Sequence, residues 1–265
     1  MPVKKRGRNG SPASDPASTL GLPASVRACL FDLDGVLTRT AELHAAAWKQ
    51  MFDRYLRQRA TRLGTSFRPF DAKADYDTYV DGKPRSDGVR SFLASRHIVL
   101  AEGRADDPPG KETVAGLGNL KNEMVLRLIH ESGVRTYEGS VRYVKVARSL
   151  GLACAVVSSS ANCGEVLDAA HIRDLFDVMI DGIVARRLHL KGKPAPDSYL
   201  VAARRLGRTP KTAAVYEDAL AGVQAGRAGR FAYVVGVDRV GQARALRSHG
   251  ADIVVRDLAE LLTPK

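Results

Sequence analysis

The chain has 265 residues, 45% of them hydrophobic and 26% charged, which is long enough for one large domain or two smaller ones with their own cores. No apolar run approaches the roughly 20 residues that a membrane span needs, and no hydrophobic stretch follows the basic N-terminal residues, so we expect neither a membrane helix nor a secretory signal. The formal net charge of +12 would suit nucleic acid. However, no zinc-finger spacing, aromatic RNA-binding motif or basic heptad region is present, so we expect no nucleic-acid partner. A basic surface that attracts small phosphorylated substrates, or only aids solubility, is favoured.

The N-terminal residues and the cysteines are interpreted from composition. Residues 1–24 are rich in Ser, Pro, Ala and Gly, which predicts a disordered tail. Cys29 and Cys154 lie in apolar runs and are expected to be small buried residues, whereas Cys163 follows a predicted loop, where partial exposure is expected. The spacing of the three cysteines suits no metal site, and a reduced, cytoplasmic setting fits best.

The first half of the chain is predicted to be mostly helical after one short strand. The apolar run at 26–30 predicts that strand. Apolar positions then recur with helical spacing, and connectors rich in Gly, Pro and Asp lie between the helical segments. The predicted helices are 41–59, 86–96 and 120–131.

From about residue 140 the pattern changes to an alternation of helices with short buried strands. The predicted strands are 153–157, 178–180, 213–216, 232–235 and 252–255, and the predicted helices are 141–150, 164–170, 195–206, 219–227 and 242–248. This alternation predicts an α/β fold, with a parallel sheet covered by helices on both faces. We therefore expect a core domain made of residues 25–39 and 139–265, interrupted by a helical cap domain at 40–138.

Two aspartates, Asp32 and Asp34, follow the first strand, and Gly35 lets the chain turn after them. Because the backbone bends beyond the end of a strand, both carboxylates can converge on the crevice where open parallel sheets bind ligands. One carboxylate can attack a phosphorus atom while the other handles protons, and a hard cation would offset their negative charge. Taken alone, the pair also fits an ordinary strand end and turn.

Three further polar clusters follow other strands or their connections. Ser158 and its neighbouring N–H groups suit a phosphoryl oxygen, although a Ser-rich turn would look similar. Lys193, just before a Pro-bounded helix start, could neutralise a transferring group, or it could be an ordinary surface lysine. Glu217 and Asp218 could complete a Mg²⁺ site with Asp32, and Asp218 could also cap the next helix. Chance would rarely place all four clusters at one edge of a sheet.

The ordered motifs FDLDGVLT, VVSSS, KGKPAPD and YEDALAG resemble the haloacid dehalogenase superfamily of phosphoryl-transfer enzymes over residues 26–262. The resemblance implies a Rossmann-like parallel-sheet core with an inserted α-helical cap. It implies that Asp32 is the nucleophile that forms an aspartyl phosphate, and that Asp34 is the general acid/base. Ser158 and Lys193 would bind the transferring phosphate. The implied Mg²⁺ ligands are Asp32, the backbone carbonyl of Asp34, Glu217 and Asp218.

Within the superfamily, the cap segments resemble the β-phosphoglucomutase subfamily. The segment TAELHAAAWK resembles its first cap helix, and the resemblance implies that Thr40, His44 and Trp48 of this helix contact the substrate. The resemblance implies that His44 contacts Asp34 or the sugar, although a partly buried helix histidine is the alternative. The motif Gly-Lys-Pro-Arg ends at Arg85 and resembles the loop whose arginine grips the phosphate that is not transferred. Further implied substrate contacts are Lys121, Asn122, Ser160 and Asn162.

The chain departs from that pattern at three places. Arg39 stands where the subfamily usually has an acidic residue, and Ala161 stands where it has a lysine. The cap is also longer, around 62–78 and 98–116. These departures bear on the sugar and on closure of the cap, and leave the core chemistry unchanged.

We therefore expect Mg²⁺-dependent phosphoryl transfer that interconverts β-glucose 1-phosphate and glucose 6-phosphate through glucose 1,6-bisphosphate, by a monomer. A sugar-phosphate phosphatase, in which water attacks the aspartyl phosphate, is the alternative. Ala161 and the longer cap favour the phosphatase, whereas His44, Arg85 and Lys121 favour the mutase. A non-catalytic phosphate-sensing or nucleic-acid-binding protein on this scaffold is a third possibility, which is disfavoured because a binder needs no nucleophile.

Overall fold

A sheet of six parallel strands forms the core, in the order β3-β2-β1-β4-β5-β6. The computed structural model describes residues 16–262. The strands are β1 (Ala28–Phe31), β2 (Ala153–Val157), β3 (Val178–Ile180), β4 (Ala213–Glu217), β5 (Tyr233–Val237) and β6 (Ile253–Val255). The strand order changes direction between β1 and β4, which opens a crevice at their carboxyl ends. The predicted α/β fold with a parallel sheet is confirmed.

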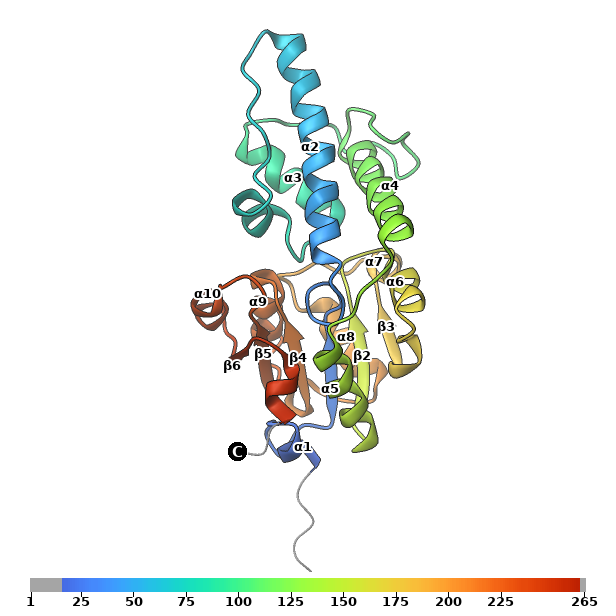
Figure 1. The fold of residues 1–265 in the computed structure, drawn as a ribbon, viewed down its shortest axis with the longest axis vertical. Helices are drawn as coiled ribbons and strands as arrows, with labels where there is room; N and C mark the ends of the chain where they lie inside the picture. Colours follow the sequence, from blue (N-terminus) through green and yellow to red (C-terminus); the bar gives the residue numbers. More distant parts are fainter. Residues whose placement is uncertain (1–15, 263–265) are drawn as a thin grey trace, which may run out of the picture.

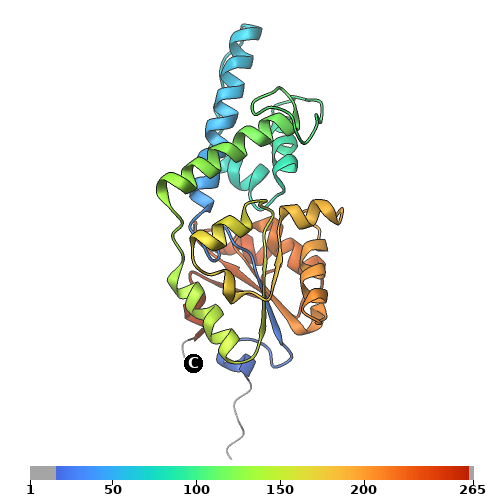
Figure 2. The ribbon, with the colours of Figure 1, turned by 90° about the vertical axis from the view of Figure 1, so that its right-hand side faces the viewer.

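Helices cover both faces of this sheet (Figure 2). They are α1 (Pro16–Thr19), α5 (Glu138–Ser149), α6 (Cys163–Ala169), α7 (Gly182–Arg187), α8 (Asp197–Arg205), α9 (Leu220–Ala228) and α10 (Ala243–Ser248), with 3-10 turns at Arg173–Leu175, Pro210–Thr212 and Leu258–Leu262. Side chains alternate along β1, so Cys29 and Phe31 pack in the cluster that contains α5, whereas Ala28 and Leu30 pack in the cluster that contains α8. Burial on both faces explains the continuous apolar runs of the strands.

A block of helices is inserted between β1 and α5, and it lies beyond the carboxyl ends of the strands (Figure 1). It contains α2 (Ala41–Leu63), a π-helix at Tyr76–Val80, α3 (Arg85–Ser95) and α4 (Val114–Ser132). The block has its own hydrophobic cluster, in which Phe52 stacks on Trp48 and Phe70 and contacts Phe92. We propose that these residues form the cap domain expected at 40–138.

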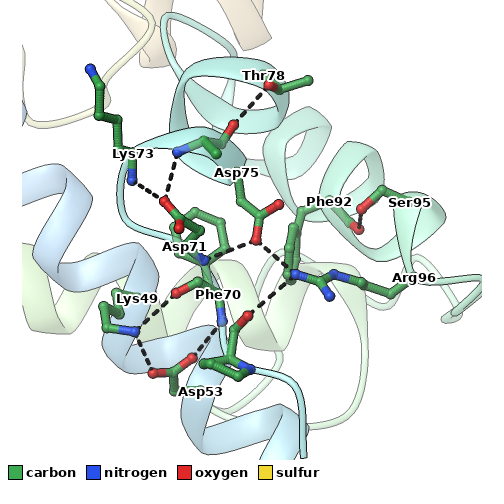
Figure 3. A network of polar contacts seen from close by, with 12 residues as sticks. Lys49, Asp53, Phe70, Asp71, Lys73, Asp75, Thr78, Phe92, Ser95 and Arg96 are labelled. Carbon is green, nitrogen blue, oxygen red and sulfur yellow. Dashed lines mark hydrogen bonds and ion pairs between the residues drawn. The ribbon is translucent and has the colours of Figure 1, made fainter. Parts of the chain in front are cut away.

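The connector between α2 and the π-helix is held by charged side chains (Figure 3). Asp53 accepts a hydrogen bond from the backbone N–H of Phe70 at 2.8 Å, and Lys49 donates to the Phe70 carbonyl at 2.9 Å. Arg96 of the segment after α3 pairs with Asp75 at 2.7 Å. These contacts fix Phe70 in the cap core, so a segment predicted only as a connector has a defined path.

Two expectations from composition are wrong in part. Within the predicted tail, residues 16–19 form α1, and Leu20 and Leu22 are buried; the hydroxyl of Tyr143 donates to the Leu20 carbonyl at 2.9 Å. Residues 1–15 lie outside the described part of the chain. Cys163, expected to be partly exposed, is buried because α6 packs it against the core. The burial predicted for Cys29 and Cys154 is confirmed. Among residues 16–262, no helix is long and apolar enough to cross a membrane.

Candidate active site

A cavity of about 970 Å³ lies between the strand ends and the inserted helices. Its volume is within the range of ligand pockets for small molecules. Residues from both parts of the chain line it, and most of the predicted site residues are among them. From the core these are Asp32, Asp34, Ser158, Ser160, Asn162 and Asp218, and from the inserted block His44, Trp48, Arg85, Lys121 and Asn122.

Lys193 joins two buried carboxylates, of which Asp32 lines the cavity, whereas Lys193 and Glu217 do not line it. Its ammonium group contacts Asp32, lies 2.5 Å from Glu217, and sits over the ring of Tyr199. The hydroxyl of Tyr199 donates to Glu217 at 2.7 Å. Burial alone would lower the pKa of Lys193, but the charges of Asp32 and Glu217 raise it above its ordinary value. Lys193 is therefore a fixed positive charge beside Asp32 rather than the surface lysine of the alternative interpretation.

The predicted metal ligands Asp32, Glu217 and Asp218 lie together, with one carboxylate oxygen of each within 4.8 Å of the others. Burial, more than any neighbouring charge, raises the pKa of both Asp32 and Asp218, and the other acids raise it further. Gly35 has a φ of +87°, and a Cβ there would overlap the carboxylate of Asp218. Crowded oxygen donors with only Lys193 to balance them fit a hard divalent cation.

Asp34 is not part of that acidic group, because its side chain turns toward the first cap helix. The hydroxyl of Thr40 donates to Asp34 Oδ1, and Thr38 and Thr40 share a hydrogen bond of 2.7 Å. Thr40, predicted as a substrate contact, is buried and does not line the cavity. Thr40 thus lies behind Asp34, where its hydroxyl orients the carboxylate, and its contact with a substrate stays a prediction.

His44 and Lys121 form a buried pair next to Asp34. Lys121 Nζ lies 2.9 Å from His44 Nδ1, and His44 Nε2 lies 3.7 Å from Asp34 Oδ1 with no hydrogen-bond partner among the described residues. Burial, followed by the charge of Lys121, lowers the pKa of His44 to about 4. Burial also lowers the pKa of Lys121 to about 7. A neutral His44 that accepts from Lys121 at Nδ1 carries its proton on Nε2, facing Asp34.

The inserted helices contact the core directly at the cavity. The hydroxyl of Ser159 donates to the Gly82 carbonyl at 2.8 Å, and Asn162 Nδ2 donates to Asn122 Oδ1 at 3.0 Å. A Cβ at Gly192 would overlap the ring of Pro84. These close contacts place the segment before Arg85 over the core, so the two parts enclose the cavity together.

Three residues that sequence reasoning missed also line the cavity: Asp81, Asn119 and Arg186. Burial, followed by the charge of Glu217, raises the pKa of Asp81 to about 7. Asn119 accepts from Arg85 Nη2 at 3.4 Å. Asp81 directly precedes the Gly-Lys-Pro-Arg motif, and Asn119 lies two residues before Lys121. This proximity to the motifs was the sequence signal that could have identified them. Arg186 lies on α7, a helix that the sequence pattern did not predict.

The chain is similar to known proteins over most of its length. The family model described as haloacid dehalogenase-like hydrolase matches residues 26–230. A β-phosphoglucomutase of Mycobacterium tuberculosis is 58% identical over 246 residues, which cover 92% of this chain and 94% of that protein. A β-phosphoglucomutase of Bacillus subtilis is 32% identical over 89% of this chain and 92% of its own length. The crystal structure of β-phosphoglucomutase from Clostridium difficile has a TM-score of 0.68 and 25% identity, and covers 89% of this chain and 93% of that one. The chain therefore belongs to the haloacid dehalogenase-like hydrolase family.

Proposed function

We propose that this protein is a Mg²⁺-dependent β-phosphoglucomutase, which interconverts β-glucose 1-phosphate and glucose 6-phosphate. The observation that carries the proposal is the cavity itself: Asp32 faces it beside the fixed charge of Lys193, while Arg85 and Lys121 face it from the inserted helices. The 58% identical relative bears the same name. A phosphate monoester carries two negative charges, and a hexose bisphosphate needs positive groups at both ends.

Asp32 is the proposed nucleophile. Its carboxylate oxygen attacks the phosphorus atom at C1 of glucose 1,6-bisphosphate, and the bond from that phosphorus to the sugar oxygen breaks, which releases glucose 6-phosphate and leaves an aspartyl phosphate. Ser158 and Lys193 would hold the oxygens of the group in transfer. Mg²⁺, held by Asp32, Glu217, Asp218 and the backbone carbonyl of Asp34, would supply charge neutralisation between the carboxylate and the phosphate.

Asp34 is the proposed general acid/base. It protonates the C1 oxygen that leaves, and in the second half of the reaction it takes the proton from the C6 hydroxyl of a β-glucose 1-phosphate, which attacks the aspartyl phosphate and regenerates glucose 1,6-bisphosphate. The hydrogen bond from Thr40 and the approach of His44 Nε2 set the direction of this carboxylate. The regenerated bisphosphate must then turn over, so that its C1 phosphate meets Asp32 in the next cycle.

A mutase must offer its aspartyl phosphate to a sugar hydroxyl while excluding water. The contacts of Ser159 with Gly82 and of Asn162 with Asn122 support this, because they hold the inserted helices against the core around the cavity. All these groups come from one chain, so we propose that the monomer is sufficient. Its three free, buried cysteines suit a reducing setting such as the cytoplasm.

Phosphorus NMR of the purified protein with Mg²⁺, β-glucose 1-phosphate and a trace of glucose 1,6-bisphosphate tests the proposal. Glucose 6-phosphate is expected to accumulate, and its formation is expected to vanish in Asp32→Asn. Inorganic phosphate in place of glucose 6-phosphate would make the protein a phosphatase. No turnover of either kind would direct the search to other phosphorylated sugars.

A further inference from the structure

Both carboxylates and positively charged side chains line the cavity. The carboxylates Asp32, Asp34 and Asp218 come from the ends of β1 and β4. Arg85 of α3 and Arg186 of α7 line another part of the same cavity, and neither guanidinium has a carboxylate partner among residues 16–262. Asp87, which also lines the cavity, is already paired with Arg90. Two unneutralised guanidinium groups that face one solvent-filled space are typical of an anion site.

Arg85 is held in place from two sides. Its aliphatic stem packs on α4, where a Cβ at Gly118 would approach it to 3.3 Å, and its Nη2 donates to Asn119. Asn119 in turn donates to the carbonyl groups of Ala105 and Asp107 in the long loop before α4. The pKa of Arg85 is lowered first by burial and then by the positive charge of Arg186, so the two guanidinium groups lie close enough to repel each other.

Helix α7 is tied to the serine loop that follows β2. Asp181 caps the helix by accepting from the Val184 N–H at 2.7 Å, and the N–H of Gly182 donates to the Ser160 carbonyl at 3.0 Å. A Cβ at Gly182 would lie 2.8 Å from the Ser159 carbonyl oxygen. The start of α7 is thus packed on the loop that carries Ala161. Ala161 stands where the subfamily has a lysine, so this loop position adds no positive charge to the cavity. This packing places Arg186 on the cavity wall, whereas Arg187 does not line the cavity.

We propose that Arg186 and Arg85 together bind the phosphate group of the bisphosphate that is not being transferred, and that Arg186 makes the enzyme prefer a dianionic group at this end of the sugar. The inference rests on the proposed function and adds a residue to it. A phosphate dianion between the two guanidinium groups removes their mutual repulsion and accepts several charge-assisted hydrogen bonds. Arg186 contacts the substrate far from the reacting atoms and is a binding residue.

The test compares a phosphoryl donor that has a second phosphate with one that has none. Glucose 1,6-bisphosphate, assayed as formation of glucose 6-phosphate, and acetyl phosphate, assayed as release of inorganic phosphate, are given to the wild type, Arg186→Gln, Arg186→Lys and Arg187→Gln. For Arg186→Gln, the ratio of kcat/KM for the bisphosphate to kcat/KM for acetyl phosphate is expected to fall about tenfold, mainly through KM. Arg186→Lys is expected to restore part of the ratio, and Arg187→Gln to keep the wild-type ratio.

The outcomes separate this inference from the function on which it rests. If the wild type uses both donors and the ratio is the same in Arg186→Gln as in the wild type, the inference is overturned while the proposed function stands. If Arg186→Gln and Arg187→Gln lower the ratio equally, the effect comes from general surface charge and the assignment to Arg186 is wrong. If the wild type uses neither donor, the proposed function fails and the inference fails with it.

Discussion

The core and the inserted helices contribute different groups to the same cavity. The core contributes buried carboxylates around Lys193, a group whose members already contact one another without ligand. The inserted helices contribute Arg85, Lys121 and His44. Arg85 donates to Asn119, Lys121 contacts His44, and His44 Nε2 has no hydrogen-bond partner among the described residues. On the proposed function, we expect phosphoryl transfer to depend on the core, and the choice of sugar hydroxyl over water to depend on the groups of the inserted helices.

Removal of Lys193 is expected to have the largest effect. Lys193→Met leaves Asp32 and Glu217 as buried acids without their positive partner, which is expected to cost about 3–5 kcal/mol of unfolding free energy and to abolish turnover. Urea unfolding measures the first effect and a phosphorus NMR time course the second. The control is Lys191→Met, which removes an exposed lysine two residues away. Equal stability of the two variants would contradict the assignment of Lys193 as the central charge of the core.

Gly35 tests the geometry of the acidic group. Gly35→Ala strains a backbone with φ of +87° and pushes a methyl group into Asp218, so we expect activity to fall at least about 100-fold and Mg²⁺ to be needed at higher concentration. Gly64→Ala is the matched control, because Gly64 has φ of +64° and open space around it. That control is expected to cost about 1 kcal/mol of stability and no activity. Full activity in Gly35→Ala would be incompatible with Asp218 as a ligand in this position.

Thr40 tests how the first cap helix acts on the core. Thr40→Val removes the hydroxyl that donates to Asp34, and we expect kcat to fall about 10- to 100-fold with little change in KM. Thr40→Ser keeps the hydroxyl and is expected to retain most of the activity. Steady-state kinetics with β-glucose 1-phosphate measures both constants. An increase in KM alone would support the original prediction that Thr40 contacts the substrate.

The pH dependence of stability tests the surroundings of His44. The pKa of His44 is lowered from 6.5 to about 4 in the folded protein, so between these values the unfolded chain binds a proton that the folded protein does not. Acidification through this window therefore favours unfolding, by about 3 kcal/mol once the pH is below 4. The difference in unfolding free energy between the wild type and His44→Asn should change across this window. A constant difference from pH 7 to pH 4 would show that His44 does not titrate as described.

The sequence predicted which core residues lie together, because Asp32, Ser158 and Glu217 directly follow strands or end them, and parallel strands end at one edge. The inserted helices were harder to predict. The presence of Asp81 and Arg186 on the same cavity as Asp218 and Arg85 depends on how the long connectors fold and on a short helix with no clear periodicity. Burial was misjudged at Cys163 and at Leu20 because composition alone does not show which side of a short helix or turn meets the core.

The Arg85→Gln variant tests most directly the claim that the core carries out phosphoryl transfer while the inserted helices select the sugar hydroxyl over water. Formation of glucose 6-phosphate from β-glucose 1-phosphate and release of phosphate from acetyl phosphate are measured side by side with the wild type. The account predicts that glucose 6-phosphate formation falls at least about 100-fold, while use of acetyl phosphate, which needs only the core, falls far less. An equal loss of both activities would contradict it, as would a variant that forms glucose 6-phosphate at the wild-type rate.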